Sequence, residues 1–186
     1  MELFPPLRLE LLNGWIPLLI FYVIFGALLR SFPKEVVQRL YDRSGWTKQQ
    51  KTLGAIGLPF AFAAFGLLIF TPLKIERTVF IIGSIVYGIG LGGMVTALFN
   101  FRNTPMDQPV IHGLYRISRN PQWVMFFILM VGMAISVGSW TIMLLFFMRA
   151  VFNHFRILGE EKACLESYGE VFQTYLQTVP RYFLIF

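Results

Sequence analysis

The sequence is poor in cysteine, histidine and charge, and each shortage excludes a class of protein or site. Cys164 is the single cysteine, so the chain can form neither an internal disulfide nor a cysteine-based metal site. Two histidines, His112 and His154, are too few for a histidine-rich metal centre, and we expect no metal. Charged residues make up 14% of the chain, against about 25% in a typical soluble domain. An ordinary soluble domain is therefore excluded.

Apolar residues take the place of the missing charge. Of the 186 residues 56% are hydrophobic and 17% aromatic, and the mean hydropathy is +0.63. Because the apolar residues stand in long blocks, we expect an all-α integral membrane protein. The net charge of +6 does not indicate nucleic-acid binding, since the basic residues lie between apolar blocks, where membrane topology requires them. The first ten residues, MELFPPLRLE, lack the basic start of a cleavable signal.

Three apolar segments in the first half of the chain have the length of a membrane-spanning helix, which needs about 20 residues. They cover residues 12–29, 53–70 and about 79–99. Pro17 falls inside the first segment, where we expect it to kink the helix, and Pro59 falls in the middle of the second. Membrane helices tolerate proline when neighbouring groups satisfy the freed carbonyl.

The last apolar block, residues 123 to about 152, is too long for one crossing. The VGSW run at residues 137–140 is suited to a turn, so we predict two shorter helices that form a hairpin. The number of membrane helices is then about five. We treat residues 1–186 as a single membrane domain, with three helices in residues 1–100 and the hairpin and tail in residues 101–186.

The basic residues are distributed asymmetrically in a five-helix topology. With the N-terminus outside, the inner segments are residues 30–52, 100–122 and 150 onward, and they hold most of the lysines and arginines. The basic residues of the outer segments are Arg8, Lys74 and Arg77. This asymmetry follows the positive-inside rule, so we expect the C-terminus to be cytosolic.

The polar tail after the last apolar block has the pattern of an amphipathic helix. Cys164, Tyr168, Phe172 and Tyr175 follow one another at helical spacing on one face. Pro180 is expected to end this helix. It is too polar to span a bilayer, so we expect it either to lie on the cytosolic membrane surface or to cap the helix bundle.

The run HGLYRISRNPQW, residues 112–123, places polar residues directly before an apolar segment. One interpretation is purely structural: Asn120 caps a helix that Pro121 begins, while Tyr115 and Trp123 belong to an interfacial aromatic belt. A functional interpretation is also open, and the tail of the chain favours it.

Glu160 and Glu161 follow directly on the last membrane helix, on the same expected side as Arg119. Two adjacent carboxylates at a membrane exit do not serve as simple anchors, a role for which lysine or arginine is suited. Two such glutamates are also typical of a solvated helix start. The functional interpretation is that they and the Arg119-Asn120-Pro121 corner converge on one water-facing cavity at the edge of the bilayer.

These residues together resemble a family of membrane enzymes, the isoprenylcysteine carboxyl methyltransferases and the phosphatidylethanolamine N-methyltransferases. The resemblance covers about residues 85–182, and two positions depart from the usual pattern: Asn120 stands where histidine is usual, and Trp123 where tyrosine is usual. The matching residues, in order, are Gly113, Tyr115, Arg119, Pro121, Trp123, Glu160, Glu161, Tyr168, Gly169, Tyr175, Pro180 and Arg181.

The resemblance implies that residues 101–186 bind S-adenosylmethionine and transfer its methyl group to a lipid-soluble or small amphipathic acceptor, at a carboxyl, thiol or amine. It implies catalytic roles for Arg119, Asn120 and Glu161. The cofactor's ribose hydroxyls and ammonium need carboxylate acceptors, its carboxylate suits arginine, and its sulfonium is favoured against aromatic faces. The residues expected around the cofactor are His112, Gly113, Tyr115, Arg119, Asn120, Pro121, Trp123, Glu160 and Glu161.

The run YGIGLGGM, residues 87–94, has two interpretations. The family places a G-x-G at roughly this distance before the R-x-P corner, which implies that Gly90 and Gly92 let the cofactor approach the third helix. Alternatively, Gly88 and Gly92 form a small-xxx-small pair for helix packing.

Two other functions stay open at this point. The tail also resembles the C-terminus of sterol reductases that use NADPH, although those proteins are much longer. A non-catalytic membrane protein of the same architecture is the other possibility, because Asn120 replaces the usual histidine. Nothing in the sequence indicates an obligatory protein partner.

Overall fold

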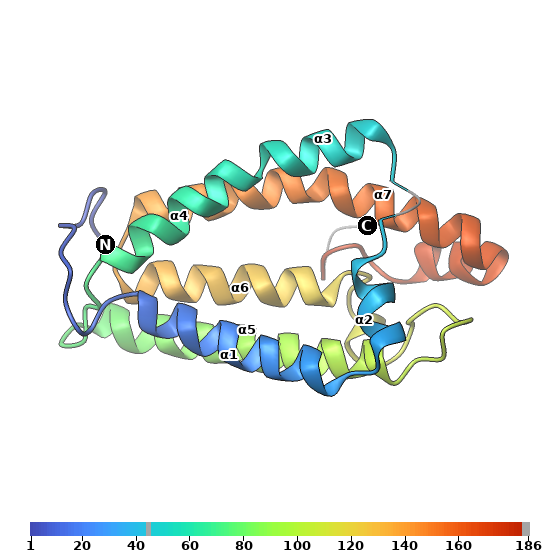
Figure 1. The fold of residues 1–186 in the computed structure, drawn as a ribbon, viewed down its shortest axis with the longest axis horizontal. Helices are drawn as coiled ribbons and strands as arrows, with labels where there is room; N and C mark the ends of the chain where they lie inside the picture. Colours follow the sequence, from blue (N-terminus) through green and yellow to red (C-terminus); the bar gives the residue numbers. More distant parts are fainter. Residues whose placement is uncertain (44–45, 184–186) are drawn as a thin grey trace.

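The computed structural model describes residues 1–43 and 46–183 and is built from helices joined by short connections (Figure 1). Beyond one short 3₁₀ turn, Gly113–Arg116, all of the regular structure in the described ranges is α-helical. The helices are α1 Trp15–Ser31, α2 Lys34–Tyr41, α3 Lys48–Ile56, α4 Leu58–Phe70, α5 Thr78–Arg102, α6 Pro121–Ser136 and α7 Trp140–Thr178.

The apolar helices make this an all-α integral membrane protein, as the composition predicted. Within the described residues, three stretches are long and apolar enough to cross a membrane, namely Lys48–Phe70, α5 and α7, and α1 and α6 are shorter apolar helices. Large apolar side chains point outward, where they would contact the lipid of a membrane and not water. Among those that are more than half exposed are Leu19, Phe62, Ile81, Ile85, Ile89, Leu144 and Phe147.

The predicted hairpin turn is confirmed. Helix α6 ends at Ser136 and α7 begins at Trp140. Gly138 adopts a φ of +68°, a left-handed conformation that glycine accepts at little cost. The side chain of Ser139 then caps α7 by accepting a hydrogen bond from the backbone N–H of Ile142 at 3.2 Å.

The two proline predictions are wrong in detail. Pro17 lies in the first turn of α1, and Pro59 lies in the first turn of α4, which is separate from α3. Proline is tolerated at these positions because the first N–H groups of a helix have no intrahelical partner. The break between α3 and α4 falls at Gly57, where a Cβ would lie 2.8 Å from that of Phe152 on α7.

Glycines bring α5 and α6 into backbone contact. A Cβ at Gly90 of α5 would collide with the backbone of Leu129, and one at Gly132 of α6 would collide with the backbone of Tyr87. The pair predicted for helix packing, Gly88 and Gly92, has nothing within 4 Å of an added Cβ. Small residues therefore do pack these helices, as in other membrane proteins, but at different positions from those predicted.

Backbone contacts gather three segments at one end of the bundle. Glu2 donates to Gly138 O at 2.7 Å, and Lys74 donates to Ser136 O at 3.0 Å. Leu73 donates to Leu12 O at 2.9 Å. The N-terminal segment, the α4–α5 connection and the α6–α7 turn thus lie together, and the polar connections of the candidate site lie at the other end (Figure 1).

The tail caps the bundle, the second of the two arrangements expected for it. Helix α7 changes direction at Gly169, whose φ of 54° and ψ of −131° are not helical, and the chain folds back along the protein (Figure 1). Phe172 and Tyr175 are buried and pack with Cys164 and Tyr168, which confirms the predicted apolar face. The helix ends before Pro180, as predicted.

Candidate functional site

A buried carboxylate joins the two motifs that the sequence separates. Glu161 is 8% exposed, and its Oε1 lies 3.1 Å from Nε of Arg119 in an ion pair whose N–H is not aligned for a hydrogen bond. Asn120 Nδ2 donates to the same Oε1 at 3.2 Å. Arg181 donates to both oxygens, from Nε at 3.1 and 3.0 Å and from Nη2 at 2.8 Å. Two arginines therefore neutralise Glu161.

The tail also holds the backbone of the Arg119 segment. The N–H of Arg119 donates to Pro180 O at 2.9 Å, and its Nη1 donates to Leu176 O at 2.6 Å. Ser118 Oγ donates to Arg181 O at 2.8 Å. These contacts satisfy buried polar groups that would otherwise destabilise the fold, and they place the corner against the end of the tail.

Tyr115 is part of the same support. Its backbone carbonyl accepts a hydrogen bond from the hydroxyl of Tyr175 at 2.6 Å, and its own hydroxyl accepts one from Gln122 Nε2 at 2.9 Å. Burial raises the pKa of the Tyr115 phenol. The phenol therefore stays protonated at neutral pH and does not act as a base.

Asn120 occupies the predicted capping position without capping. It precedes α6, and Pro121 is the first helical residue, as expected. Its side chain makes no cap hydrogen bond and reaches Glu161 instead. The Nδ2 group of Asn120 donates to the charged Glu161 carboxylate, and this charge-assisted bond directs the amide away from the backbone N–H groups that its Oδ1 would cap.

Glu160 has a different environment from its neighbour. Its side chain is 30% exposed and accepts a hydrogen bond from Arg156 Nε at 3.0 Å. The Arg156 guanidinium lies over two indole rings, 4.5 Å from the centroid of Trp123 and 4.8 Å from that of Trp46. Trp123, one of the residues expected around the cofactor, therefore has a cation of the protein itself against its ring.

These groups surround one cavity of about 530 Å³, a size that holds a drug-sized molecule. The Arg119 corner and the two glutamates thus face one space, as expected from their order in the chain. Helix α1, α5 and α6 add an apolar side to it. The lining residues that matter below are Phe21, Phe25, Arg43, Trp46, Phe126, Tyr115, Arg119, Asn120, Trp123, Arg156, Glu160 and Glu161.

A sequence model of the phospholipid methyltransferase family matches residues 63–171, more than half of the chain. The chain belongs to this family. It is therefore a membrane methyltransferase that acts on lipid. No individual curated protein matches the chain. The matched part of the methyltransferase includes the corner and both glutamates, and it leaves out α1, α2, Trp46 and Arg181.

Five of the residues expected around the cofactor lie outside the cavity lining of the methyltransferase, among them Pro121, which is buried at the start of α6. Gly90 packs against α6, and Gly92 has open space around it. Gly113 has a φ of +60° and lies against the side chain of Asn100, so it serves the local turn. His112 lines a second cavity.

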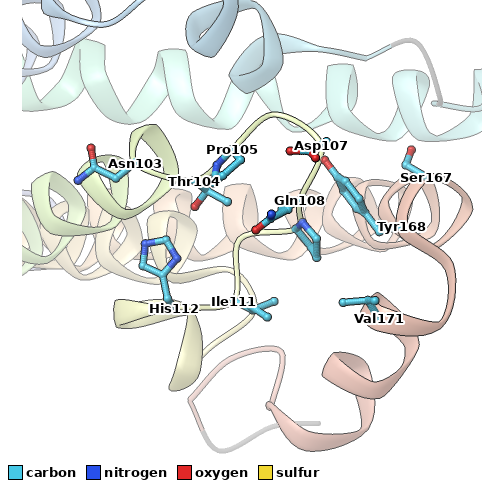
Figure 2. A pocket seen from close by; sticks show the side chains of 11 residues that line it. Asn103, Thr104, Pro105, Asp107, Gln108, Ile111, His112, Ser167, Tyr168 and Val171 are labelled. Atoms are coloured by element: carbon cyan, nitrogen blue, oxygen red, sulfur yellow. The ribbon is translucent and has the colours of Figure 1, made fainter.

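The second cavity has about 590 Å³ and lies between the loop after α5 and the tail end of α7. Figure 2 shows the loop side chains on one side and Ser167, Tyr168 and Val171 of α7 on the other. Tyr168 lines both cavities, and its hydroxyl accepts a hydrogen bond from Arg39 at 3.1 Å. Arg39 of α2, which lines the main cavity, thus contacts a residue that lines both cavities.

The lining of the main cavity includes groups that were not among the candidate site residues, among them Arg39, Arg43, Trp46 and Arg156. Arg39 comes from α2, a helix that was not predicted, and Trp46 comes from the connection that follows it. The sequence signal for Arg156 was its i, i+4 spacing to Glu160 on one helix. No spacing rule indicates Arg39 or Trp46, because their contacts to α7 depend on how the first half of the chain packs against the second.

Proposed function

We propose that this methyltransferase uses S-adenosylmethionine and methylates a lipid-soluble or amphipathic acceptor at the membrane interface. The observation that carries the proposal is the single cavity on which the Arg119 corner, Glu160 and the aromatic residues of the first half converge. A polar cofactor enters from water and an apolar acceptor enters from lipid. A cavity with one polar side and one apolar side can bind both.

The chemistry of the lining residues fits the cofactor. Glu160 is partly exposed and is suited to accept hydrogen bonds from the ammonium or the ribose hydroxyls. Arg43, which lies over the Trp46 ring at 5.3 Å and lines the same cavity, is suited to the cofactor's carboxylate. The rings of Phe21, Phe25 and others provide faces that attract a soft cation.

The roles of the buried groups follow from their contacts. Arg119 and Glu161 neutralise each other, and Glu161 also accepts from Asn120, so the three hold the corner of the cavity in one arrangement. We assign the catalytic contribution of Arg119, Asn120 and Glu161 to this positioning and to the exclusion of water. S-adenosylmethionine supplies the methyl group when it is bound.

The acceptor decides whether a base is required. A carboxylate is already ionised at neutral pH and needs none, whereas an ammonium must first lose a proton. Tyr115 stays protonated and cannot take that proton. Of the two adjacent glutamates of the motif, Glu160 has the more exposed side chain, so we propose it for this role if the acceptor is an amine.

Calorimetry on the detergent-purified protein tests the cofactor. We expect heat of binding with S-adenosylmethionine and none with NADPH, the cofactor of the reductase-like alternative. Incubation with radiolabelled S-adenosylmethionine and a total lipid extract then identifies the methylated lipid. Binding of NADPH alone, or the absence of both binding and methyl transfer, would refute the proposal.

A further inference from the structure

Four side chains alternate in one stack beside the main cavity. Arg43 lies over the ring of Trp46 at 5.3 Å, and Arg156 lies over the same ring at 4.8 Å. Arg156 also lies over Trp123 at 4.5 Å. Guanidinium groups and indole rings thus follow one another from the α2–α3 connection to the start of α6. Each such contact is attractive, and more so where water is partly excluded.

The stack ends on Glu160. Nε of Arg156 donates to Glu160 Oε1 at 3.0 Å. The ion pair with Arg156 uses one carboxylate oxygen, which leaves the group able to accept from a ligand. The rotamer of Glu160 therefore depends on Arg156, and that of Arg156 depends on the two rings.

Trp46, like Arg43, comes from the first half of the chain, and of the two it is the member that contacts Arg156. It is 9% exposed and lies before residue 63, where the match to the family begins. Without its ring, Arg156 would have an indole on one face alone. The long arginine side chain would then regain rotamers, and the direction of Glu160 would no longer be determined.

We propose that Trp46 and Arg156 are positioning residues that orient Glu160 toward the ligand in the main cavity. The proposal rests on the proposed function, because the ligand considered is S-adenosylmethionine. It assigns a part of the site to the segment before the family match. In this arrangement Arg156 orients the carboxylate of Glu160, and Glu160 balances the charge of Arg156 before the ligand binds.

Double-mutant cycles in S-adenosylmethionine affinity, measured by calorimetry, test this proposal. We expect Trp46→Ala and Arg156→Gln each to weaken binding by about tenfold. Trp46→Phe, which keeps an aromatic face, should stay within about threefold of the wild type. In the Glu160→Gln background the Trp46→Ala change should have a smaller effect than in the wild type, since part of its effect acts through Glu160.

The outcomes separate this proposal from the proposed function. If the wild type binds S-adenosylmethionine and Trp46→Ala binds it equally well, the positioning role is refuted and the function stands. Full additivity of Trp46→Ala with Glu160→Gln would likewise refute it, because it indicates a general structural effect. If the wild type binds no S-adenosylmethionine, the proposed function itself fails. Thermal unfolding without ligand checks that each variant is folded, and Trp46→Phe tests the role if Trp46→Ala does not fold.

Discussion

Arg181 holds Glu161 through both carboxylate oxygens, with its Nη2 2.8 Å from Oε2. Arg181 lies beyond residue 171, the last residue of the family match, and Glu161 lies within the match. This contact ties the end of the chain to the motif at the centre of the site. The two adjacent glutamates thereby differ: both line the cavity, but Glu161 is buried between two arginines, whereas Glu160 is more exposed and has one arginine partner.

Arg181→Ala should destabilise the protein. The substitution leaves the buried carboxylate of Glu161 with Arg119 as its remaining cationic partner, and we expect a loss of about 1–3 kcal/mol in the free energy of unfolding. Arg181→Lys should recover part of it, because lysine keeps the charge and loses the bidentate geometry. Thermal unfolding in detergent measures both variants.

The matched control for this prediction is Lys162→Ala. Lys162 and Glu166 form an exposed pair with 3.8 Å between Nζ and Oε1, which contributes about 0–1 kcal/mol at most. Equal melting temperatures for Arg181→Ala and the control would contradict a structural role for the contact between Arg181 and Glu161.

Glu160→Gln and Glu161→Gln should have different effects. The first removes a charge that faces the cavity, so we expect S-adenosylmethionine affinity to fall by about tenfold with little change in unfolding temperature. The second leaves Arg119 and Arg181 without their buried counter-charge, so we expect it to lower stability as well as affinity. Calorimetry and thermal unfolding on the same preparations separate the two. A larger loss of stability in Glu160→Gln than in Glu161→Gln would reverse the assignment.

Gly90→Ala and Gly92→Ala distinguish packing from cofactor binding in the glycine-rich run. A Cβ at Gly90 would collide with the backbone of Leu129, so we expect Gly90→Ala to destabilise the protein by about 1–3 kcal/mol. At Gly92 there is open space, so alanine should leave both stability and S-adenosylmethionine affinity unchanged. Thermal unfolding and calorimetry measure the two effects. Weaker binding by Gly92→Ala at unchanged stability would restore the role that the family resemblance implied for Gly92.

The two ends of the bundle should lie on opposite sides of the membrane, with the tail in the cytosol. Arg119 contacts Pro180 at one end, and Glu2 contacts Gly138 at the other. In a Cys164→Ser background, we expect an impermeant thiol reagent added to intact cells to label Glu76→Cys and to spare Lys162→Cys. Labelling of both positions after permeabilisation is the control. Labelling of Lys162→Cys alone in intact cells would place the tail outside.

Much of the fold was readable from the sequence, because lipid imposes simple rules on it. Long apolar runs marked the membrane helices, and the glycine and serine of the 137–140 run marked the turn between α6 and α7. The positions of the prolines within the helices were predicted wrongly. Pro59 was placed in the middle of a helix, although the structure begins α4 beside it, since where a helix breaks depends on what packs against Gly57.

The candidate site was also predictable only in part from the sequence. The order of Arg119, Asn120, Glu160 and Glu161 along the chain was enough to predict that they meet, and they do. Which glutamate is buried among arginines and which one has the more exposed side chain could not be read from two identical neighbours. That depends on the direction in which each side chain leaves α7 and on what the folded tail places in front of it.

The amino-acid sequence by itself determined that this is a helical membrane protein with a methyltransferase motif, because hydrophobic length and motif order are local properties of the chain. Only the tertiary structure decided that Trp46 and Arg39, from outside the motif, complete the cavity walls. Those contacts join segments distant in sequence, and their energy comes from the stacking of rings and guanidinium groups that are brought together only when the two halves pack.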